Sequence, residues 1–462
     1  MSMLTATDPR TGIVVREVPP ATPDEVDAVL AAAEAAWPAW RARDVAARAE
    51  AMRAVGALLR ERTEDLAPLM TQEMGKPITE ARGEVAKAAW CAEHYAEHAA
   101  AYLADEVIGS DASRSYVQHL PLGVVLGILP WNAPFWLALR FAAPALMAGN
   151  VGVLKHDPHV PGCAQAIGEV FAAALAEAGA PAGVFQNLPL ETAAVAGVVR
   201  DPRVQAVSFT GSARGGAAVA SVAAGEIKPA VLELGGSDPC LVLADADLDA
   251  AADTIALSRI INAGQSCIAA KRIIVEAPVY DALVARLRER LAALRTGDPS
   301  DPATDVGPIA RADLRENLHR QVTETVAAGA RLLLGGEVPD GPGYFYPPTL
   351  LADVTDDMTA ACEETFGPVL AVLRADDADD ALAMANRTDY GLAASVWSTP
   401  ERGEALAREI QAGQVAVNGI VKTDPRLPSG GIKRSGYGRE LGPHGIREFV
   451  NAQQVWVGPR RD

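Results

Sequence analysis

Short apolar runs alternate with helical stretches over most of the chain. From residue 124 to 235 the strand-like runs are 124–129, 151–155, 183–187, 205–209 and 229–233, and after residue 236 they are 239–243, 272–275, 331–334, 369–373 and 393–397. Parallel strands need a crossover connection, which a helix commonly supplies. The alternation therefore predicts an α/β chain with two parallel sheets, each covered by helices.

The region before the first sheet has a different pattern. Residues 1–20 look extended, and residues 23–104 are Ala-rich with helical periodicity. We expect about four helices there, because the helical pattern is interrupted near Pro38 and at Gly75–Lys76–Pro77.

Composition limits the partners of the chain. The formal net charge of −18 at pH 7 argues against a basic face for nucleic acid. The segment Met1–Glu17 lacks the apolar core of a signal peptide, and no run of about 18 apolar residues could span a bilayer. We expect a cytoplasmic protein that acts on a small molecule, with neither a nucleic-acid nor a membrane partner.

No metal site is expected. The five cysteines are widely spaced and form no C-x-x-C pair, which favours reduced thiols over disulfides or zinc. His94 and His98 match the H-x-x-E-H spacing of a zinc-protease helix. Two histidines on a polar helical face are common, and we interpret this pair as a solvated helix surface.

One cysteine, Cys267, follows a Gly-containing turn in the sequence INAGQSC. A thiol at a turn is accessible, and nearby backbone N–H groups can stabilise a thiolate. Most free cysteines are packing residues, which is our interpretation of Cys91, Cys163, Cys240 and Cys362. Cys267 is the candidate nucleophile.

Three other groups lie where predicted strands end. Asn132, in PWNAP, could donate its amide to a developing oxyanion. Glu233 could act as a general base. Gly211 and Ser212, in FTGS, open a helix whose free N–H groups suit a pyrophosphate. Taken singly, a capping asparagine, an exposed glutamate and turn glycines are the commoner interpretations.

As a set, these stretches resemble the aldehyde dehydrogenase superfamily. PWNAP, FTGS, ELGG from Glu233, GQSC ending at Cys267 and EETFGP from Glu363 occur in the order of that family and span nearly the whole chain. The resemblance implies two Rossmann-like parallel-sheet domains and a small β oligomerisation element. It implies a homodimer or homotetramer with a cofactor-binding domain (residues 1–105 and 122–235), a catalytic domain (236–432) and an oligomerisation element (106–121 and 433–462).

The resemblance also implies a mechanism. The Cys267 thiolate would attack an aldehyde to give a thiohemiacetal, with the Asn132 amide and the Cys267 backbone N–H as the oxyanion hole. Hydride transfer to a nicotinamide would leave a thioester, and Glu233 would activate the water that releases the acid. Such an oxyanion donor contributes about 3–4 kcal/mol in other enzymes.

For the cofactor, NAD or NADP, the resemblance implies a set of contacts. Lys155 would hold the adenosine ribose, Glu364 the nicotinamide ribose, and Phe366 would pack beside the ring. The adenine and pyrophosphate path would be lined by Trp131, Gly211, Ser212 and Gly216. NAD-preferring relatives commonly carry a glutamate three residues after the lysine, and Pro158 stands there instead. The choice between NAD and NADP therefore stays open, and we slightly favour an enzyme that tolerates NADP.

Arg140 matches an arginine that succinate-semialdehyde dehydrogenases use for the substrate carboxylate, which a guanidinium can bind with two hydrogen bonds. Segments such as RFAAPALMAGNVGVLKH and KRSGYGREL resemble the bacterial branch of that group. Two positions differ, with Ile261 in place of a second arginine and Ser429 in place of a phenylalanine. A short carboxylated semialdehyde is the expected substrate.

Other functions are weighed against this one. If Arg140 belongs to a helix-surface ion pair, the chain is a broad-specificity enzyme for uncharged aldehydes. A CoA-acylating enzyme is disfavoured by Glu233, and a catalytically silent binding protein by the joint presence of Cys267, Glu233 and Asn132.

Overall fold

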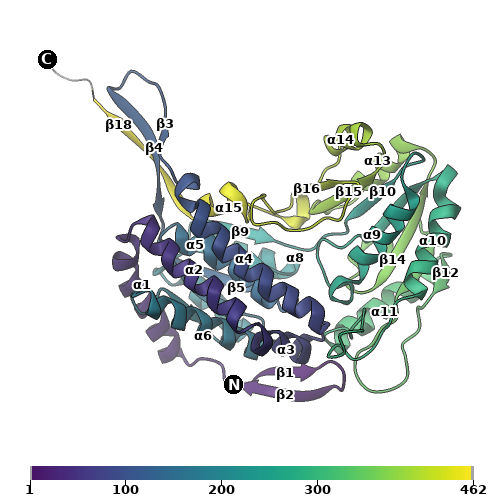
Figure 1. Ribbon diagram of the computed structural model, residues 1–462, viewed down its shortest axis with the longest axis horizontal. Coiled ribbons are helices and arrows are strands. Elements are labelled where there is room, and N and C mark those ends of the chain that lie inside the picture. Colours follow the sequence, from purple (N-terminus) through teal and green to yellow (C-terminus); the bar gives the residue numbers. More distant parts are fainter. Residues whose placement is uncertain (1–2, 459–462) are drawn as a thin grey trace.

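Two separate sheets arise from the alternation of strands and helices. The computed structural model describes residues 3–458. One sheet has six strands, in the order β17 (Gly436–Tyr437), β9 (Ala230–Glu233), β8 (Val204–Thr210), β5 (Val124–Leu129), β6 (Val151–His156) and β7 (Phe185–Asn187). Figure 1 shows this sheet in one lobe and the other sheet in a second lobe. The predicted α/β fold with two Rossmann-like domains is confirmed.

The strand order of the first sheet changes direction beside β5. From β5 the chain moves outward through β6 to β7 on one side, then returns to pair β8 with the other side of β5 and continues to β9. In open α/β sheets, ligands bind outside the carboxyl ends of the strands at such a switch point. Those ends here are followed by the segment with Trp131 and Asn132 and by the segment with Gly211 and Ser212.

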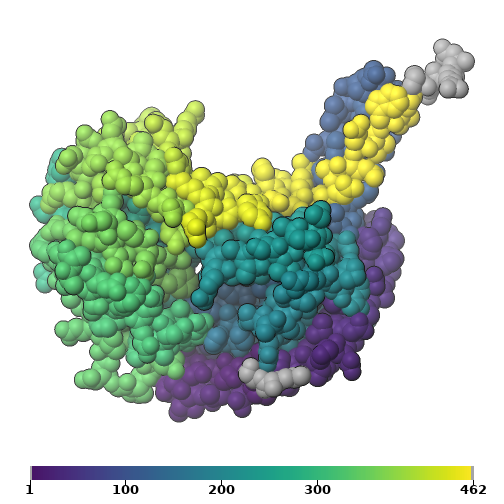
Figure 2. Space-filling model, turned by 180° about the vertical axis from the view of Figure 1, so that it is seen from behind, coloured from purple at the N-terminus to yellow at the C-terminus, as the bar shows by residue number. Residues whose placement is uncertain are grey.

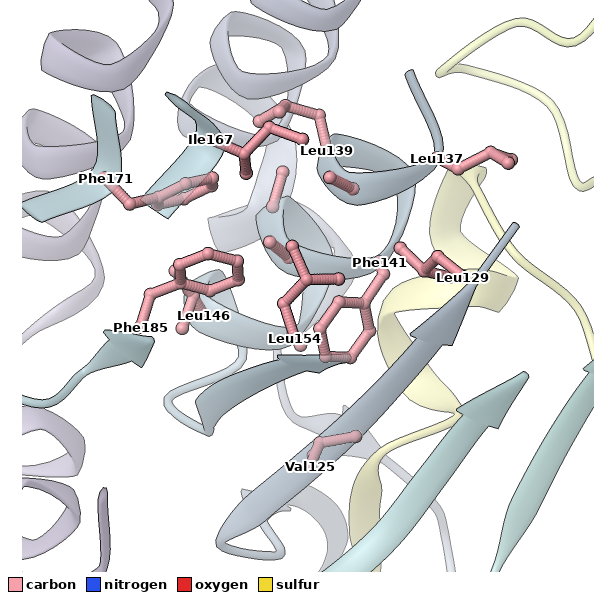
Figure 3. Close-up of a cluster of buried hydrophobic side chains, with 14 of the residues drawn as sticks. Val125, Leu129, Leu137, Leu139, Phe141, Leu146, Leu154, Ile167, Phe171 and Phe185 are labelled. Carbon is pink, nitrogen blue, oxygen red and sulfur yellow. The ribbon is translucent and has the colours of Figure 1, made fainter. Parts of the chain in front are cut away.

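Two helices cover one face of this sheet and form its core. They are α5 (Pro134–Met147) and α6 (Pro161–Glu177). Figure 3 shows their apolar side chains meeting those of β5, β6 and β7, with Phe171 stacked on Phe185 at 4.0 Å between ring centroids. Gly127 of β5 lies beneath Phe141, where a Cβ atom would come within 2.5 Å of the ring. This close approach lets α5 lie directly on the sheet.

Four helices precede the first sheet, as predicted: α1 (Pro23–Arg41), α2 (Val45–Glu61), α3 (Thr63–Met74) and α4 (Ile78–Tyr102). The predicted break near Pro38 is wrong, because α1 continues through Pro38 to Arg41. Proline removes the helical hydrogen bond of its own missing N–H, and α1 continues across this gap. The Ala42 N–H still donates to the Pro38 carbonyl at 3.3 Å. The predicted break at Gly75–Lys76–Pro77 separates α3 from α4.

The second sheet has seven strands. Their order is β12 (Arg331–Leu334), β13 (Thr349–Ala352), β14 (Val369–Ala375), β11 (Arg272–Glu276), β10 (Pro239–Val242), β15 (Ala393–Trp397) and β16 (Gln414–Val417). All neighbours are parallel except β12 and β13. β13 and β16 were not predicted.

The other helices of this lobe are α9 (Leu248–Ile260), α10 (Tyr280–Ala292), α11 (Ala312–Ala327), α12 (Thr359–Cys362), α13 (Ala378–Asn386) and α14 (Pro400–Ala407). The first lobe also holds the hairpin β1 (Leu4–Asp8) and β2 (Ile13–Val18), and α7 (Val195–Arg200), α8 (Ala213–Gly225) and α15 (Gly442–Arg447). Residues 1–20 were expected to be extended, and their described part forms this hairpin.

A three-stranded antiparallel arm projects from the body (Figures 1 and 2). It consists of β18 (Val450–Val457), β4 (Arg114–Pro121) and β3 (Glu106–Val107), with β4 in the middle. β18 pairs with β4 from Val450↔Pro121 to Val457↔Arg114. The arm lies within the predicted oligomerisation element (106–121 and 433–462), whose last four residues lie outside the described part. Within that element, β17 belongs to the first sheet and not to the arm. Its role in assembly stays a prediction.

Two interpretations of single residues are corrected by their surroundings. Cys362 is exposed at the end of the one-turn helix α12 and is not a packing residue, unlike the buried Cys91, Cys163 and Cys240. His94 is only 4% exposed, so its face of α4 is not a solvated surface. Its Nε2 is hydrogen-bonded to the Tyr102 hydroxyl at 3.1 Å. Among the residues that the structure describes, no group of three His, Cys, Asp or Glu side chains could hold a metal ion.

Candidate active site

The turn after β5 meets the turn before Cys267, although they belong to different lobes. Asn132 Nδ2 donates to the Gln265 carbonyl at 3.1 Å. Asn262 Nδ2 donates to the carbonyls of Asn132, at 2.9 Å, and of Gln265, at 3.1 Å. The structure thus brings the predicted amide donor onto the loop of the predicted nucleophile.

The loop before Cys267 has an uncommon backbone. Asn262, Ala263 and Gly264 have φ angles of 57°, 53° and 76°, so three consecutive residues are left-handed. A glycine is needed at the third position, because a Cβ atom there would lie 2.3 Å from the Gly367 carbonyl oxygen. Backbone strain of this kind persists only when surrounding contacts hold it, and it is concentrated at functional sites.

Helix α4 supplies some of those contacts. Glu80 accepts a hydrogen bond from the Asn262 N–H at 2.7 Å. One turn further along, Glu84 Oε1 accepts from the N–H groups of Phe135, at 2.9 Å, and Trp136, at 3.2 Å, in the first turn of α5. Two carboxylates of one helix therefore hold the cysteine loop and the segment that follows Asn132.

Lys76 completes this support. Its Nζ forms a buried ion pair with Glu84 and donates to the Asn132 carbonyl at 3.0 Å. From the sequence, Gly75–Lys76–Pro77 was expected only to interrupt the helical pattern, and this contact of Lys76 was not predicted. The partners of a lysine between two helices depend on how those helices pack, which the local sequence does not reveal.

Glu233 lies at the end of β9 and is 4% exposed, so the alternative of an exposed glutamate is wrong. Its Oε2 is 3.3 Å from Arg140 Nη2, and its Oε1 has no hydrogen-bond partner among the described residues. Burial raises the pKa of Glu233 to about 7, while the charge of Arg140 acts in the opposite direction. A carboxylate with such a pKa can take and release a proton near neutral pH.

Arg140 is buried within α5 and only 3% exposed. Besides Glu233, its guanidinium forms a close ion pair with Glu440, from the segment between β17 and α15. It is therefore not part of a helix-surface ion pair. Its contact with substrate stays a prediction, and Glu440 is a neighbour that the sequence analysis missed.

Cys267 is partly exposed, and charged groups surround its thiol. Desolvation raises the pKa of the thiol to about 12, and the positive charges of Lys271 and Arg140 oppose that rise. Lys271 is fully buried and donates from Nζ to the Cys267 carbonyl. The resting thiol is protonated, so its reaction as a nucleophile requires transfer of the proton to a base.

Lys271 also links the thiol to a predicted cofactor residue. Its Nζ is 3.4 Å from Glu364 Oε1, which accepts from the Gly236 N–H at 3.1 Å. A Cβ atom on Gly235 would lie 2.2 Å from Glu364 Oε2. The sequence analysis did not single out Lys271, although its position four residues after the cysteine was visible.

The groups at the switch point are of the kind that binds a dinucleotide. Ser212 caps α8 by accepting from the Gly215 N–H at 3.2 Å, and the buried hydroxyl oxygen of the adjacent Thr210 has no partner within residues 3–458. Such a helix start binds a pyrophosphate. Gly216 contributes packing: a Cβ atom there would lie 2.5 Å from the Leu234 side chain.

Other predicted cofactor residues follow or lie within neighbouring strands of the first sheet, or contact them. Lys155 is buried and is the second-to-last residue of the strand β6. The Trp131 and Phe366 rings meet edge to face, with 5.9 Å between their centroids. Beyond β6, His159 Nδ1 is 2.7 Å from Asp157 Oδ1. Although burial acts against it, hydrogen bonding from His159 holds the pKa of Asp157 below its usual range. This carboxylate therefore stays ionised near neutral pH.

Comparison with known proteins agrees with this geometry. The model of the Aldehyde dehydrogenase family matches residues 2–455. A Mycobacterium ulcerans protein named succinate-semialdehyde dehydrogenase [NADP(+)] 1 is 49% identical over 98% of this chain and 100% of its own. A Synechocystis protein named probable succinate-semialdehyde dehydrogenase [NADP(+)] is 48% identical over 97% of this chain and 98% of its own.

Two solved structures have the same fold. Succinic semialdehyde dehydrogenase from Streptococcus pyogenes, in complex with NADP+, has a TM-score of 0.95 at 36% identity and covers 98% of this chain and 100% of its own. An NAD-dependent aldehyde dehydrogenase from Sinorhizobium meliloti has a TM-score of 0.95 at 40% identity and covers 100% of this chain and 92% of its own.

Proposed function

The chain belongs to the aldehyde dehydrogenase family, and from that premise we propose that it oxidises succinate semialdehyde to succinate with NADP+. The observation that carries the proposal is the site itself, where the Asn132 amide contacts the Cys267 loop and the charges of Glu233 and Arg140 act on the Cys267 thiol. Relatives at 47–49% identity that are named for this substrate and nucleotide support the choice of both.

In the first half of the proposed reaction, the Cys267 thiol releases its proton to solvent and the thiolate sulfur attacks the aldehyde carbon. The carbonyl oxygen becomes an oxyanion, and Asn132 Nδ2 and the Cys267 backbone N–H donate to it. The hydride then leaves this carbon, and a bound nicotinamide supplies the acceptor. The carbonyl re-forms, and the carbon stays bonded to sulfur as a thioester.

In the second half, Glu233 takes a proton from a water molecule as the water oxygen attacks the thioester carbon. The carbon–sulfur bond breaks, the acid leaves, and the thiolate of Cys267 is restored. Burial suits Glu233 to this role, because a base with a pKa of about 7 accepts a proton and releases it again near neutral pH.

A substrate comparison tests the proposal. Succinate semialdehyde and butanal have the same carbon number, and only the first carries a carboxylate. We expect kcat/KM with NADP+ to be at least about 10-fold higher for succinate semialdehyde, as a charge-assisted hydrogen bond implies. Formation of NADPH measures the rate, and a parallel series with NAD+ measures the nucleotide preference. Equal kcat/KM values for the two aldehydes would reject a carboxylated substrate.

One observation favours a second candidate, a broad-specificity aldehyde dehydrogenase for uncharged aldehydes. Arg140 is already paired with Glu233 and Glu440, so its charge is offset before any substrate arrives. In this case butanal and longer uncharged aldehydes would match or exceed succinate semialdehyde in the same comparison.

Changing Asn132 to alanine tests the oxyanion hole. We expect kcat to fall by about 10²- to 10³-fold, because the developing oxyanion loses one donor. The affinity for NADP+, measured by fluorescence titration, should change little. Asn132→Asp is the matched variant, since it keeps the size of the side chain but brings negative charge to the oxyanion, and it should be at least as slow. Wild-type kcat in Asn132→Ala would exclude this role.

For assembly, we propose that two copies associate through the arm. Its outer strands β18 and β3 have free edges, and Val107 and Trp456 are exposed on them. Unpaired strand edges are pairing surfaces.

In the described part of the chain, no helix is both long and apolar enough to cross a membrane. A cytoplasmic homodimer or homotetramer is the assembly we propose.

A further inference from the structure

The buried cation Arg140 is poorly suited to bind a carboxylate by itself. Its guanidinium is shared between Glu233 and Glu440, and all three groups are buried. A substrate carboxylate arriving there would face two carboxylates for one positive charge. Like charges at short range in a buried site are unfavourable. A second cation is needed to bind a carboxylated aldehyde.

Lys87 provides such a cation. It lies on α4 and its Nζ donates to the Thr423 hydroxyl at 2.8 Å and lies 4.2 Å from the centroid of the Trp136 ring. Over residues 3–458, no ion pair within 4.0 Å links this ammonium to a carboxylate. An ammonium group has three donors, so Lys87 keeps donors for another acceptor.

The surroundings of Lys87 connect it with the site. Trp136 precedes Arg140 by one turn of α5. Thr423 lies between β16 and β17 on the segment that reaches Gly430, where a Cβ atom would lie 2.8 Å from Glu233 Oε1. The same two elements therefore contact Lys87 at one point and border Arg140 and Glu233 at another. Lys87 thus packs against elements that also border Glu233.

The charge of Lys87 is retained at neutral pH. Burial lowers the pKa of Lys87 to about 8, and the charge of Arg140 lowers it further, whereas Glu84, Cys91 and Asp424 raise it. The influence of Arg140 also shows that the two cations act on the same region. Placing a carboxylate beside Lys87 would relieve the repulsion between them.

We propose that Lys87 binds the distal carboxylate of the substrate and selects carboxylated over uncharged aldehydes. The inference deepens the proposed function and rests on it. The carboxylate would accept from Lys87 Nζ and from the Thr423 hydroxyl, while the aldehyde carbon reaches Cys267. Arg140 then acts mainly by orienting Glu233 and by adding to the positive field.

Lys87→Met tests this role, because methionine keeps an unbranched side chain and removes the charge. We expect KM for succinate semialdehyde to rise about 10- to 100-fold, with kcat changed less than about 3-fold, and KM for butanal to stay within about 2-fold. Lys422→Met is the matched control: Lys422 is exposed beside Thr423, and its removal changes the net charge equally. It should leave both KM values unchanged. Lys87→Arg should keep most of the selectivity.

Two results would overturn the inference: an unchanged KM for succinate semialdehyde in Lys87→Met, or an equal rise for both aldehydes, which would indicate a structural role. Thermal unfolding of each variant checks that the fold is kept, and Lys87→Arg serves as the second variant. The wild-type preference is measured first, with glutarate semialdehyde included. If the wild type prefers glutarate semialdehyde, succinate semialdehyde is rejected as the substrate, and the role of Lys87 is then tested by the KM for glutarate semialdehyde. If it prefers butanal, both proposals fail.

Discussion

Cys267→Ala is expected to lower the turnover of aldehyde by about 10⁵-fold or more, a loss of the size seen when covalent nucleophiles are removed. Without the sulfur, neither the thiohemiacetal nor the thioester can form. Reduction of NADP+ followed by absorbance measures the loss. The fold and the nucleotide site should remain, because Cys267 lies in a loop outside both sheets.

Cys362→Ala is the matched control for that experiment. Cys362 is exposed on α12, and its thiol donates to the Asp356 carbonyl. We expect its replacement to leave turnover within about 2-fold of wild type, as for most surface substitutions. Turnover in Cys267→Ala within about 10-fold of wild type would rule out covalent catalysis at this residue.

Glu233→Gln is expected to lower kcat by about 10²- to 10⁴-fold, the range for loss of a general base. The amide keeps the size of the side chain but cannot take a proton from water. A burst of NADPH approaching one equivalent per subunit should precede the slow phase in stopped-flow traces, because the thioester forms before the water attacks. Absence of a burst would assign Glu233 to deprotonation of Cys267 as well.

The pH profile follows from the same group. Burial raises the pKa of Glu233 to about 7, and the base acts only as the carboxylate. For the wild type, kcat should therefore fall about 10-fold per pH unit below pH 7 and level off above it. In Glu233→Gln this inflection should disappear, and an unchanged inflection would assign it to another group.

Much of the first lobe was predictable, because its strands are apolar runs that end at turn residues. The strand ends before Asn132 and after Glu233 were correct to within one residue, so both side chains were expected at one edge of the sheet. The short strands β13 and β16 were not predicted, although other strands of similar length were. Pro38 was misjudged because α1 accommodates the proline and ends three residues later, at Arg41.

The charged surroundings of the site could not be predicted. Arg140 and Glu440 are 300 residues apart in sequence, and only the fold brings them together. The same is true of Lys76, whose partner Asn132 follows a strand of the first sheet, and of Lys87 and Thr423. Burial of Glu233 and His94 depends on which face of an element is covered, and both look like ordinary polar positions in sequence.

The position of Glu80 and Glu84 on a single helix limits how the enzyme can move. Glu84 anchors the start of α5 beside Asn132, and Glu80 anchors the loop before Cys267. Because a helix is stiff over one turn, these two anchors cannot separate. Hinge bending between the lobes would have to break the Glu80–Asn262 hydrogen bond before it could part the amide from the sulfur. The proposed oxyanion hole is thus preassembled, and no domain closure is required to build it.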